Sequence, residues 1–215
     1  MTRQTSNSKP SASWERRRQV VAHYERQLKQ HGATARGMDW KDAASQRLRF
    51  EMLTEGLDLA GSSVHDVGAG AGHFYDYLLE GAIDVRYCGS DLSGEMIEAA
   101  RGRHPDATFE HRDVLDESNT AKYDFVFCSG LFNVKLDCPE PAWQSFVESA
   151  VLRMYEMCTV AISFNLMSDR VDYRAEGLYY SDPDAMAEFC RSHLSPDVTV
   201  RHDYPLYEYT IHVRR

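Results

Sequence analysis

The residues best suited to chemistry form a glycine-rich run from Val64 to Gly72, VHDVGAGAG, between an apolar segment and a helical one. Glycine lets the backbone turn sharply and approach a ligand closely, and the following helix offers unpaired N–H groups at its start. The run is not a dinucleotide fingerprint, because neither register of G-x-G-x-x-G ends in glycine or alanine. A carboxylate at Asp66 suits a ligand that carries an amino group.

Two more carboxylates follow predicted strands. Asp91 lies 19 residues past Gly72, where an acidic residue can accept hydrogen bonds from both hydroxyls of a ribose. Alternatively, Asp91 only caps the helix that begins near Ser93. Asp113, followed by Val114, could accept a hydrogen bond from an exocyclic amine, although aspartate is also common in turns.

The elements that must position these groups alternate along the chain. Strands are predicted at 64–67, 85–90, 107–111, 123–128 and 159–164, with helices at 72–79, 94–103 and 141–157 between them. A helix at 183–194 is then followed by strands at 197–201 and 206–213, whose short connection allows only an antiparallel hairpin. We therefore predict an α/β fold with a doubly wound, mostly parallel seven-stranded sheet and an antiparallel last strand.

Composition restricts the class of protein. The chain has 215 residues, 43% of them hydrophobic, as expected for one globular domain with decorations. A net charge of -9 weighs against a nucleic-acid substrate. The five cysteines form no C-x-x-C pair, so we predict no metal site and a reducing compartment. Because neither a signal peptide nor a bilayer-length apolar run is visible, we expect a cytoplasmic protein without membrane contact.

Taken together, the motifs resemble the class I S-adenosylmethionine-dependent methyltransferase superfamily. The resemblance is carried by Asp66–Gly72, by Gly89–Met96 (GSDLSGEM), by Asp113-Val114 and by Tyr123–Phe127 (YDFVF), and covers about 62–164. It implies a Rossmann-like methyltransferase fold with S-adenosyl-L-methionine as cofactor. The glycine loop would then lie under the methionine moiety of the cofactor.

The resemblance also implies a role for each site residue. Asp66 would bind the amino group of the cofactor, directly or through water, and Asp91 would hold the ribose hydroxyls. Leu92 and Met96 would flank the adenine. Asp113 and Val114 would read the adenine edge, and Ser129 would lie near the methionine part and the methyl group. The expected cofactor-binding residues are thus Asp66, Gly68, Ala69, Gly70, Gly72, Asp91, Leu92, Met96, Asp113, Val114 and Ser129.

Two positions depart from the family pattern. His65 stands where the first strand normally has an apolar residue, and we predict a core histidine that is hydrogen-bonded or near a sheet edge. The segment Cys128–Asn133, CSGLFN, lacks the Asn/Asp-Pro-Pro-aromatic signature of enzymes that methylate amino groups of nucleic-acid bases. That substrate class is therefore doubtful.

Three regions are expected along the chain: a disordered tail at 1–13, an N-terminal helical cap at 14–60, and the S-adenosylmethionine-binding methyltransferase domain at 61–215. The cap has helices at 14–31 and about 41–59, and we expect it to act as a lid over the acceptor. In this cap, Trp40 and Arg49 could close the cofactor site, where the arginine could hold the cofactor carboxylate or an acidic substrate. They could instead be a core tryptophan and a surface arginine.

The acceptor site is defined only by candidates. The catalytic residue is unknown, with His202, Asn133 and Tyr204 as candidates. His202 is the best base by chemistry, since its unperturbed pKa is about 6.5; it could equally be a solvent-facing strand histidine. An ionised carboxylate acceptor would need no base. Possible lid or substrate residues are Trp40, Arg49, Asn165, Tyr179 and Tyr180.

We predict methyl transfer to a small-molecule acceptor, an O- or N-methylation by in-line displacement, by a monomer or homodimer. A methyltransferase-like non-catalytic or partner-dependent subunit is the main alternative. A tRNA or protein methyltransferase is disfavoured by the charge and by the absence of an appended recognition domain. A nicotinamide-dependent oxidoreductase is disfavoured by the missing third glycine and the antiparallel final strand.

Overall fold

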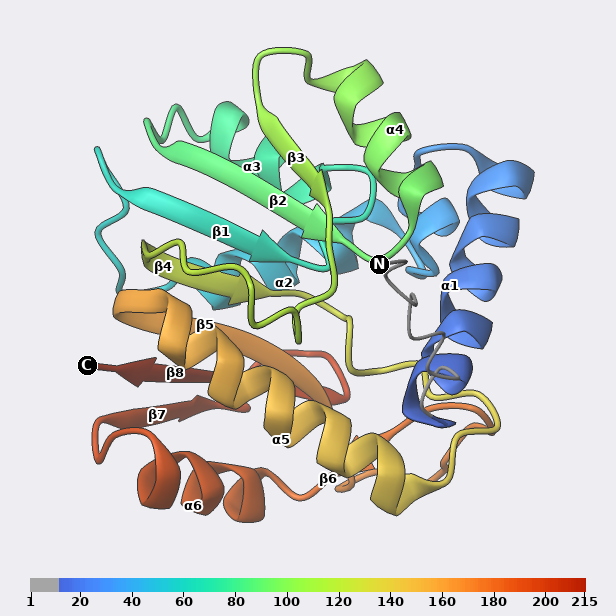
Figure 1. Ribbon diagram of the computed structural model, residues 1–215. Coiled ribbons are helices and arrows are strands. Elements are labelled where there is room, and N and C mark those ends of the chain that lie inside the picture. The colour runs from blue at the N-terminus through green and yellow to red at the C-terminus, as the bar shows by residue number, and fades with distance from the viewer. Residues whose placement is uncertain (1–11) are drawn as a thin grey trace, which may run out of the picture.

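The computed structural model describes residues 12–215, with side chains from Arg17 onward, so most of the predicted tail at 1–13 lies outside the described residues. Figure 1 shows a twisted sheet with helices on both faces. The helices are α1 (Ala12–His31), the 3-10 turn η1 (Arg36–Met38), α2 (Ala43–Thr54), α3 (His73–Glu80), α4 (Gly94–Arg103), α5 (Glu140–Met157) and α6 (Pro183–His193). No helix in this part of the chain is long and apolar enough to cross a membrane.

Within residues 12–215, eight strands form one sheet with the order β3-β2-β1-β4-β5-β8-β7, and β6 pairs with β5. The strands are β1 (Ser63–Val67), β2 (Arg86–Asp91), β3 (Thr108–His111), β4 (Tyr123–Cys128), β5 (Cys158–Ser168), β6 (Tyr180–Ser181), β7 (Val198–Arg201) and β8 (Glu208–Arg214).

The strand directions confirm the predicted fold. Strands β1 to β5 pair in parallel, whereas β8 runs antiparallel to both β5 and β7. The predicted hairpin of β7 and β8 is present, and β8 is inserted beside β5. The short β6 was not predicted. Because β1, β2 and β4 are parallel neighbours, the loops that follow them meet at one edge of the sheet.

Alternate residues of β4 pack into different layers, as the period of two in a strand requires. Phe125 and Phe127 pack with α2, α3 and α4, whereas Val126 and Cys128 pack with the apolar stripe of α5. In Figure 1, α5 and α6 accordingly cover one face of the sheet. His65 of β1 is buried between the layers, as predicted for a core histidine, and its Nε2 lies 2.9 Å from Oγ of Ser90. Burial lowers the pKa of His65 to about 4.

The two N-terminal helices have different positions. Helix α1 lies at the carboxyl edge of the sheet (Figure 1), where Lys29 pairs with Glu95 of α4 at 2.7 Å. Helix α2 ends at Thr54, earlier than predicted, and buries Phe50 and Leu53 against α3. Helix α1 and the turn η1 therefore cover the edge of the sheet, whereas α2 belongs mainly to a helical layer.

Candidate functional site

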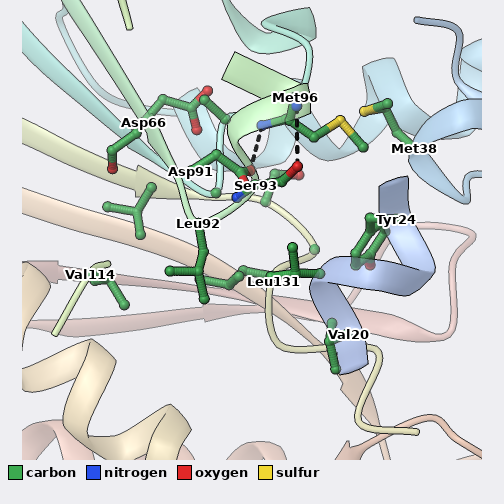
Figure 2. A pocket seen from close by; sticks show the side chains of 18 of the residues that line it. Val20, Tyr24, Met38, Asp66, Asp91, Leu92, Ser93, Met96, Val114 and Leu131 are labelled. Carbon is green, nitrogen blue, oxygen red and sulfur yellow. Dashed lines mark hydrogen bonds between the residues drawn. The ribbon is translucent and has the colours of Figure 1, made fainter. Parts of the chain in front are cut away.

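A cavity opens at the carboxyl edge of the sheet, between α1 and the loops that follow β1, β2, β3 and β4. Figure 2 shows Val20 and Tyr24 of α1 on one side of it, with Asp66 and Asp91 on the other. Met38 and Met96 lie side by side within it. The residues predicted as site residues that line this cavity are Trp40, Asp66, Gly68, Ala69, Gly70, Asp91, Leu92, Met96, Asp113, Val114 and Ser129.

Gly72 is the one predicted cofactor residue that does not line the cavity. It is the N-cap of α3 and has a φ of 83°, a conformation that favours glycine. A Cβ atom at this position would lie 3.0 Å from the rings of His104 and Phe109. Gly72 therefore serves the turn and its packing rather than the cavity wall.

Asp91 joins the end of β2 to the glycine loop. One carboxylate oxygen accepts a hydrogen bond from the Gly70 N–H at 2.9 Å, and the other accepts one from the Ser93 N–H at 2.8 Å. The N-cap of α4 is Ser93, whose Oγ accepts a hydrogen bond from the Met96 N–H. Asp91 is therefore more than a helix cap, because it fixes the loop and faces the cavity. Burial raises the pKa of Asp91.

Asp66 lies deeper in the same wall. Its side chain is buried, and its Oδ2 accepts a hydrogen bond from the Tyr87 hydroxyl at 2.7 Å. Burial raises the pKa of Asp66 to about 7, the Tyr87 hydrogen bond opposes the rise, and the charge of Asp91 adds to it. A cationic ligand would favour the ionised form of this carboxyl.

The far end of the cavity has apolar walls from Leu92, Val114 and Leu131 (Figure 2). Asp113, at the same end, already binds a side chain of α1. Arg17 donates hydrogen bonds to both of its carboxylate oxygens, at 2.6 and 2.7 Å. Helix α1 is thus fastened over the place where the resemblance puts the adenine.

A closed circuit of contacts includes two residues of the cavity wall, Trp40 and Gly130. The Gly130 N–H donates to Oδ1 of Asn165 at 2.9 Å, and the amide of Asn165 donates to Glu208. Glu208 forms a buried ion pair with Arg49, which donates from Nε at 2.9 and 3.0 Å. The guanidinium of Arg49 stacks 4.1 Å from the centre of the Trp40 ring, which in turn lies against Gly130.

These contacts show which of the roles expected for Trp40 and Arg49 the structure supports. Trp40 is in the cavity wall, whereas Arg49 and Asn165 stand behind it and do not line the cavity. Arg49 is only 8% exposed and its charge is neutralised by Glu208, so it is neither a surface arginine nor a free cation for a ligand. It supports Trp40 instead.

The three catalytic candidates are not brought to the cavity. His202 lies half-exposed in the loop between β7 and β8, with its ring 6.3 Å from that of Tyr209. The Tyr204 hydroxyl is 3.0 Å from Oγ1 of Thr210, so this side chain folds back onto β8. Asn133 is buried outside the cavity, and its carbonyl accepts a hydrogen bond from the Tyr179 N–H at 2.8 Å.

Tyr179 and Tyr180 also lie away from the cavity lining. Both are buried, and the Tyr180 hydroxyl accepts a hydrogen bond from the Ala175 N–H at 3.0 Å. Tyr180 begins the short strand β6, which pairs with the end of β5, and Tyr179 directly precedes it. The insertion therefore has a structural role next to the sheet edge.

Several cavity residues were not predicted from the sequence: Arg17, Tyr24, Gln46 and His73 in the lining, and Tyr87 and Glu208 behind it. Tyr24 and Arg17 reach the cavity only because α1 docks on the sheet edge. His73 begins α3 directly after the glycine loop, and this position in the sequence could have identified it as a cavity residue. The other residues are defined by packing between distant parts of the chain.

Residues 65–151 match the family model of a methyltransferase domain. The protein Rv1506c of Mycobacterium tuberculosis, named as a methyltransferase, is 34% identical over 159 residues, which are 71% of this chain and 93% of that protein. A trans-aconitate 2-methyltransferase of Afipia carboxidovorans is 30% identical over 103 residues, 44% of this chain and 40% of that enzyme.

A solved structure shows the same fold. It is the 1,6-didemethyltoxoflavin-N1-methyltransferase of Burkholderia thailandensis, with bound 1,6-didemethyltoxoflavin and S-adenosylhomocysteine. It has a TM-score of 0.67 at 17% identity and covers 97% of this chain and 92% of its own. The glycine loop, the order of strands in the sheet and the Mycobacterium relative, which is matched over nearly its whole length, all indicate the same family. The chain belongs to the class I S-adenosylmethionine-dependent methyltransferase superfamily.

Proposed function

We propose that this chain binds S-adenosylmethionine in the cavity and transfers its methyl group to an oxygen or nitrogen of a small molecule. The observation that carries the proposal is the position of Asp91. Its carboxylate lines the cavity at the end of β2 and accepts a hydrogen bond from the Gly70 N–H of the glycine loop. Each carboxylate oxygen has further acceptor capacity, so a ribose diol can bind the same group.

The other cavity residues fit the remaining parts of the cofactor. Asp66 would hold the amino group, and the apolar side chains of Leu92, Met96 and Val114 would pack on the adenine. The buried Oγ of Ser129, next to Gly130, makes no hydrogen bond within the described residues and is available to a ligand. When bound, the cofactor supplies an electrophilic methyl group on its sulfonium.

The protein's own contribution would be alignment. An in-line displacement needs the acceptor atom opposite the leaving sulfur, and correct placement alone can lower the barrier by about 7–11 kcal/mol in the best cases. The wall formed by Trp40 and Gly130 is supported from behind by Arg49 and Asn165, which would help to fix the acceptor's position. No general base is proposed, because His202, Asn133 and Tyr204 lie elsewhere.

The proposed acceptor class has support from the relatives. Two proteins named above act, by their names, on trans-aconitate and on 1,6-didemethyltoxoflavin, both small molecules. The net charge of -9 also disfavours a nucleic-acid partner. We therefore keep a small-molecule acceptor ahead of a tRNA or a protein.

The proposal is tested by incubating the full chain with methyl-labelled S-adenosylmethionine and a panel of small acids, amines and alcohols. We expect S-adenosylhomocysteine to form only when a suitable acceptor is present. Tight cofactor binding without turnover of any acceptor would favour the partner-dependent or non-catalytic subunit. Fluorescence transfer from the protein to NADH would revive the oxidoreductase and contradict the proposal.

A further inference from the structure

A second hollow, open to the surface, meets the cofactor cavity at Trp40. It lies between α1 and the segment that joins α1 to α2. Its lining consists of Gln27, His31, Arg36, Asp39, Trp40 and Lys41. Among the residues that the structure describes, Trp40 alone lines both spaces. Trp40 therefore borders both the surface hollow and the proposed cofactor site.

The local backbone explains this placement. The turn η1 is tight, and a Cβ atom at Gly37 would lie 1.9 Å from the carbonyl oxygen of Gly32. Asp39 follows with a φ of 62°, in the left-handed region, and the Trp40 N–H then donates to the Ala35 carbonyl at 2.9 Å. The chain thus reverses so that the Trp40 ring packs inward, while the side chains before and after it stay in solvent.

Two cationic side chains line the hollow. Arg36 and Lys41 are exposed, and neither forms an ion pair with any described residue. The one carboxylate in the lining, Asp39, lies 2.9 Å from His23. Some other exposed cations of this acidic protein do have an ion-pair partner, as Arg47 has in Glu80 and Lys29 in Glu95. Two cations beside one carboxylate leave the lining with more positive than negative charge, which attracts anionic ligands.

We propose that this hollow receives the methyl acceptor and that the acceptor is a small carboxylic acid with more than one carboxylate. Arg36 and Lys41 would bind the carboxylates that are not methylated, since guanidinium and ammonium groups recognise carboxylates through charge-assisted hydrogen bonds. The reacting carboxylate would pass the edge of Trp40 and meet the methyl group beside Gly130. This inference rests on the proposed function.

The reaction balances without a base. A carboxylate oxygen donates an electron pair to the methyl carbon, the bond from that carbon to sulfur breaks, and the electron pair of that bond stays on sulfur. The products are a methyl ester and S-adenosylhomocysteine, and no proton moves. A carboxylate acceptor is therefore compatible with a cavity that His202, Asn133 and Tyr204 do not reach.

The test measures turnover of the full chain with trans-aconitate, citrate and succinate, and with ethanolamine and glycerol for comparison. We expect base-labile methyl esters from at least one of the acids. Arg36→Gln and Lys41→Gln should each raise KM for that acid at least fivefold, with kcat within about twofold. Arg191→Gln, which removes an exposed cation on α6, is the matched control and should leave KM unchanged.

A titration with S-adenosylhomocysteine distinguishes a failure of this inference from a failure of the proposed function. Unchanged affinity in both variants, together with a raised KM, supports the hollow as the acceptor site. The inference is overturned if the wild type binds S-adenosylhomocysteine and methylates ethanolamine or glycerol but no acid. It is also overturned if the variant that combines Arg36→Gln and Lys41→Gln keeps the wild-type KM. Failure of the wild type to bind S-adenosylhomocysteine would overturn the proposed function, and this inference would fall with it.

Discussion

The indole of Trp40 occupies the space that a side chain on Gly130 would need. A Cβ atom at residue 130 would lie 2.4 Å from Cη2 of Trp40, and the φ of Gly130 is 78°. Both facts require glycine at this position. The contact joins the segment before α2 to the loop after β4, and so links the surface hollow to the proposed methyl position.

Gly130→Ala should destabilise the fold and displace Trp40. We expect a loss of roughly 2–4 kcal/mol in the free energy of unfolding, from the positive φ and from overpacking together. Urea denaturation measures it. Gly61→Ala is the matched control, because Gly61 has a φ of 71° and a Cβ atom there would meet nothing within 4 Å. Equal losses in the two variants would show that the Trp40 contact contributes nothing.

The pH dependence of cofactor binding should report on Asp66. The folded carboxyl has a pKa of about 7, above its ordinary value of 3.8, because it is buried. Ionisation is thus disfavoured in the fold, which loses stability as pH rises from about 4 to 7. A cationic ligand favours the ionised carboxyl, so its affinity should increase as pH rises through 7. Calorimetric titration between pH 5.5 and 8.5 measures this increase.

Two variants assign that pH dependence to one group. Asp66→Asn should remove the part of it that the carboxyl causes. Tyr87→Phe should move the midpoint to higher pH, because the Tyr87 hydroxyl lowers the pKa of Asp66. An Asp66→Asn protein with the wild-type pH profile would show that Asp66 does not contact the cofactor.

The buried pair of Arg49 and Glu208 should be costly to break from one side. Arg49→Met or Glu208→Gln alone leaves a polar group unpaired in the interior, at a cost of about 3–5 kcal/mol. The double variant should lose less than the sum of the two. Arg47→Met, on the exposed face of the same helix, should cost far less, because solvent screens its ion pairs. Strict additivity of the two buried changes would rule out the coupling.

His202→Ala should leave turnover within about twofold of the wild type. Its side chain lies in the loop between β7 and β8 and does not line the cavity. Loss of a general base typically costs about 10²–10⁴-fold in rate, so the two cases are easily separated. A rate loss of that size, with the fold intact, would mean that the hairpin loop reaches the acceptor.

The sequence predicted the sheet because its signals are local. Alternation of strands and helices, and the short connection before β8, give the order of elements and the antiparallel strand without any knowledge of packing. The glycine loop, Asp91 and Asp113 follow strand ends, and parallel strands bring their carboxyl ends to one edge. These residues therefore gathered as predicted, apart from Gly72.

The contacts that the N-terminal helices make with the site could not be predicted in the same way. Arg17 binds Asp113 across 96 positions of sequence, and Arg49 binds Glu208 across 159. Neither pair has a local pattern, because each depends on how a helix docks against the sheet. His202 and Tyr204 follow a strand at the correct edge, but their loop folds back on β8 and away from the cavity.

The central claim is that the cavity beside Asp91 binds the cofactor, and calorimetric titration of the wild type and Asp91→Ala with S-adenosylmethionine and S-adenosylhomocysteine tests it most directly. We predict one bound molecule of either ligand per wild-type chain. Asp91→Ala should weaken both affinities by roughly 1–3 kcal/mol, since charge-assisted hydrogen bonds are lost. A folded wild-type protein that binds neither ligand, or an Asp91→Ala protein with unchanged affinity, would contradict the account.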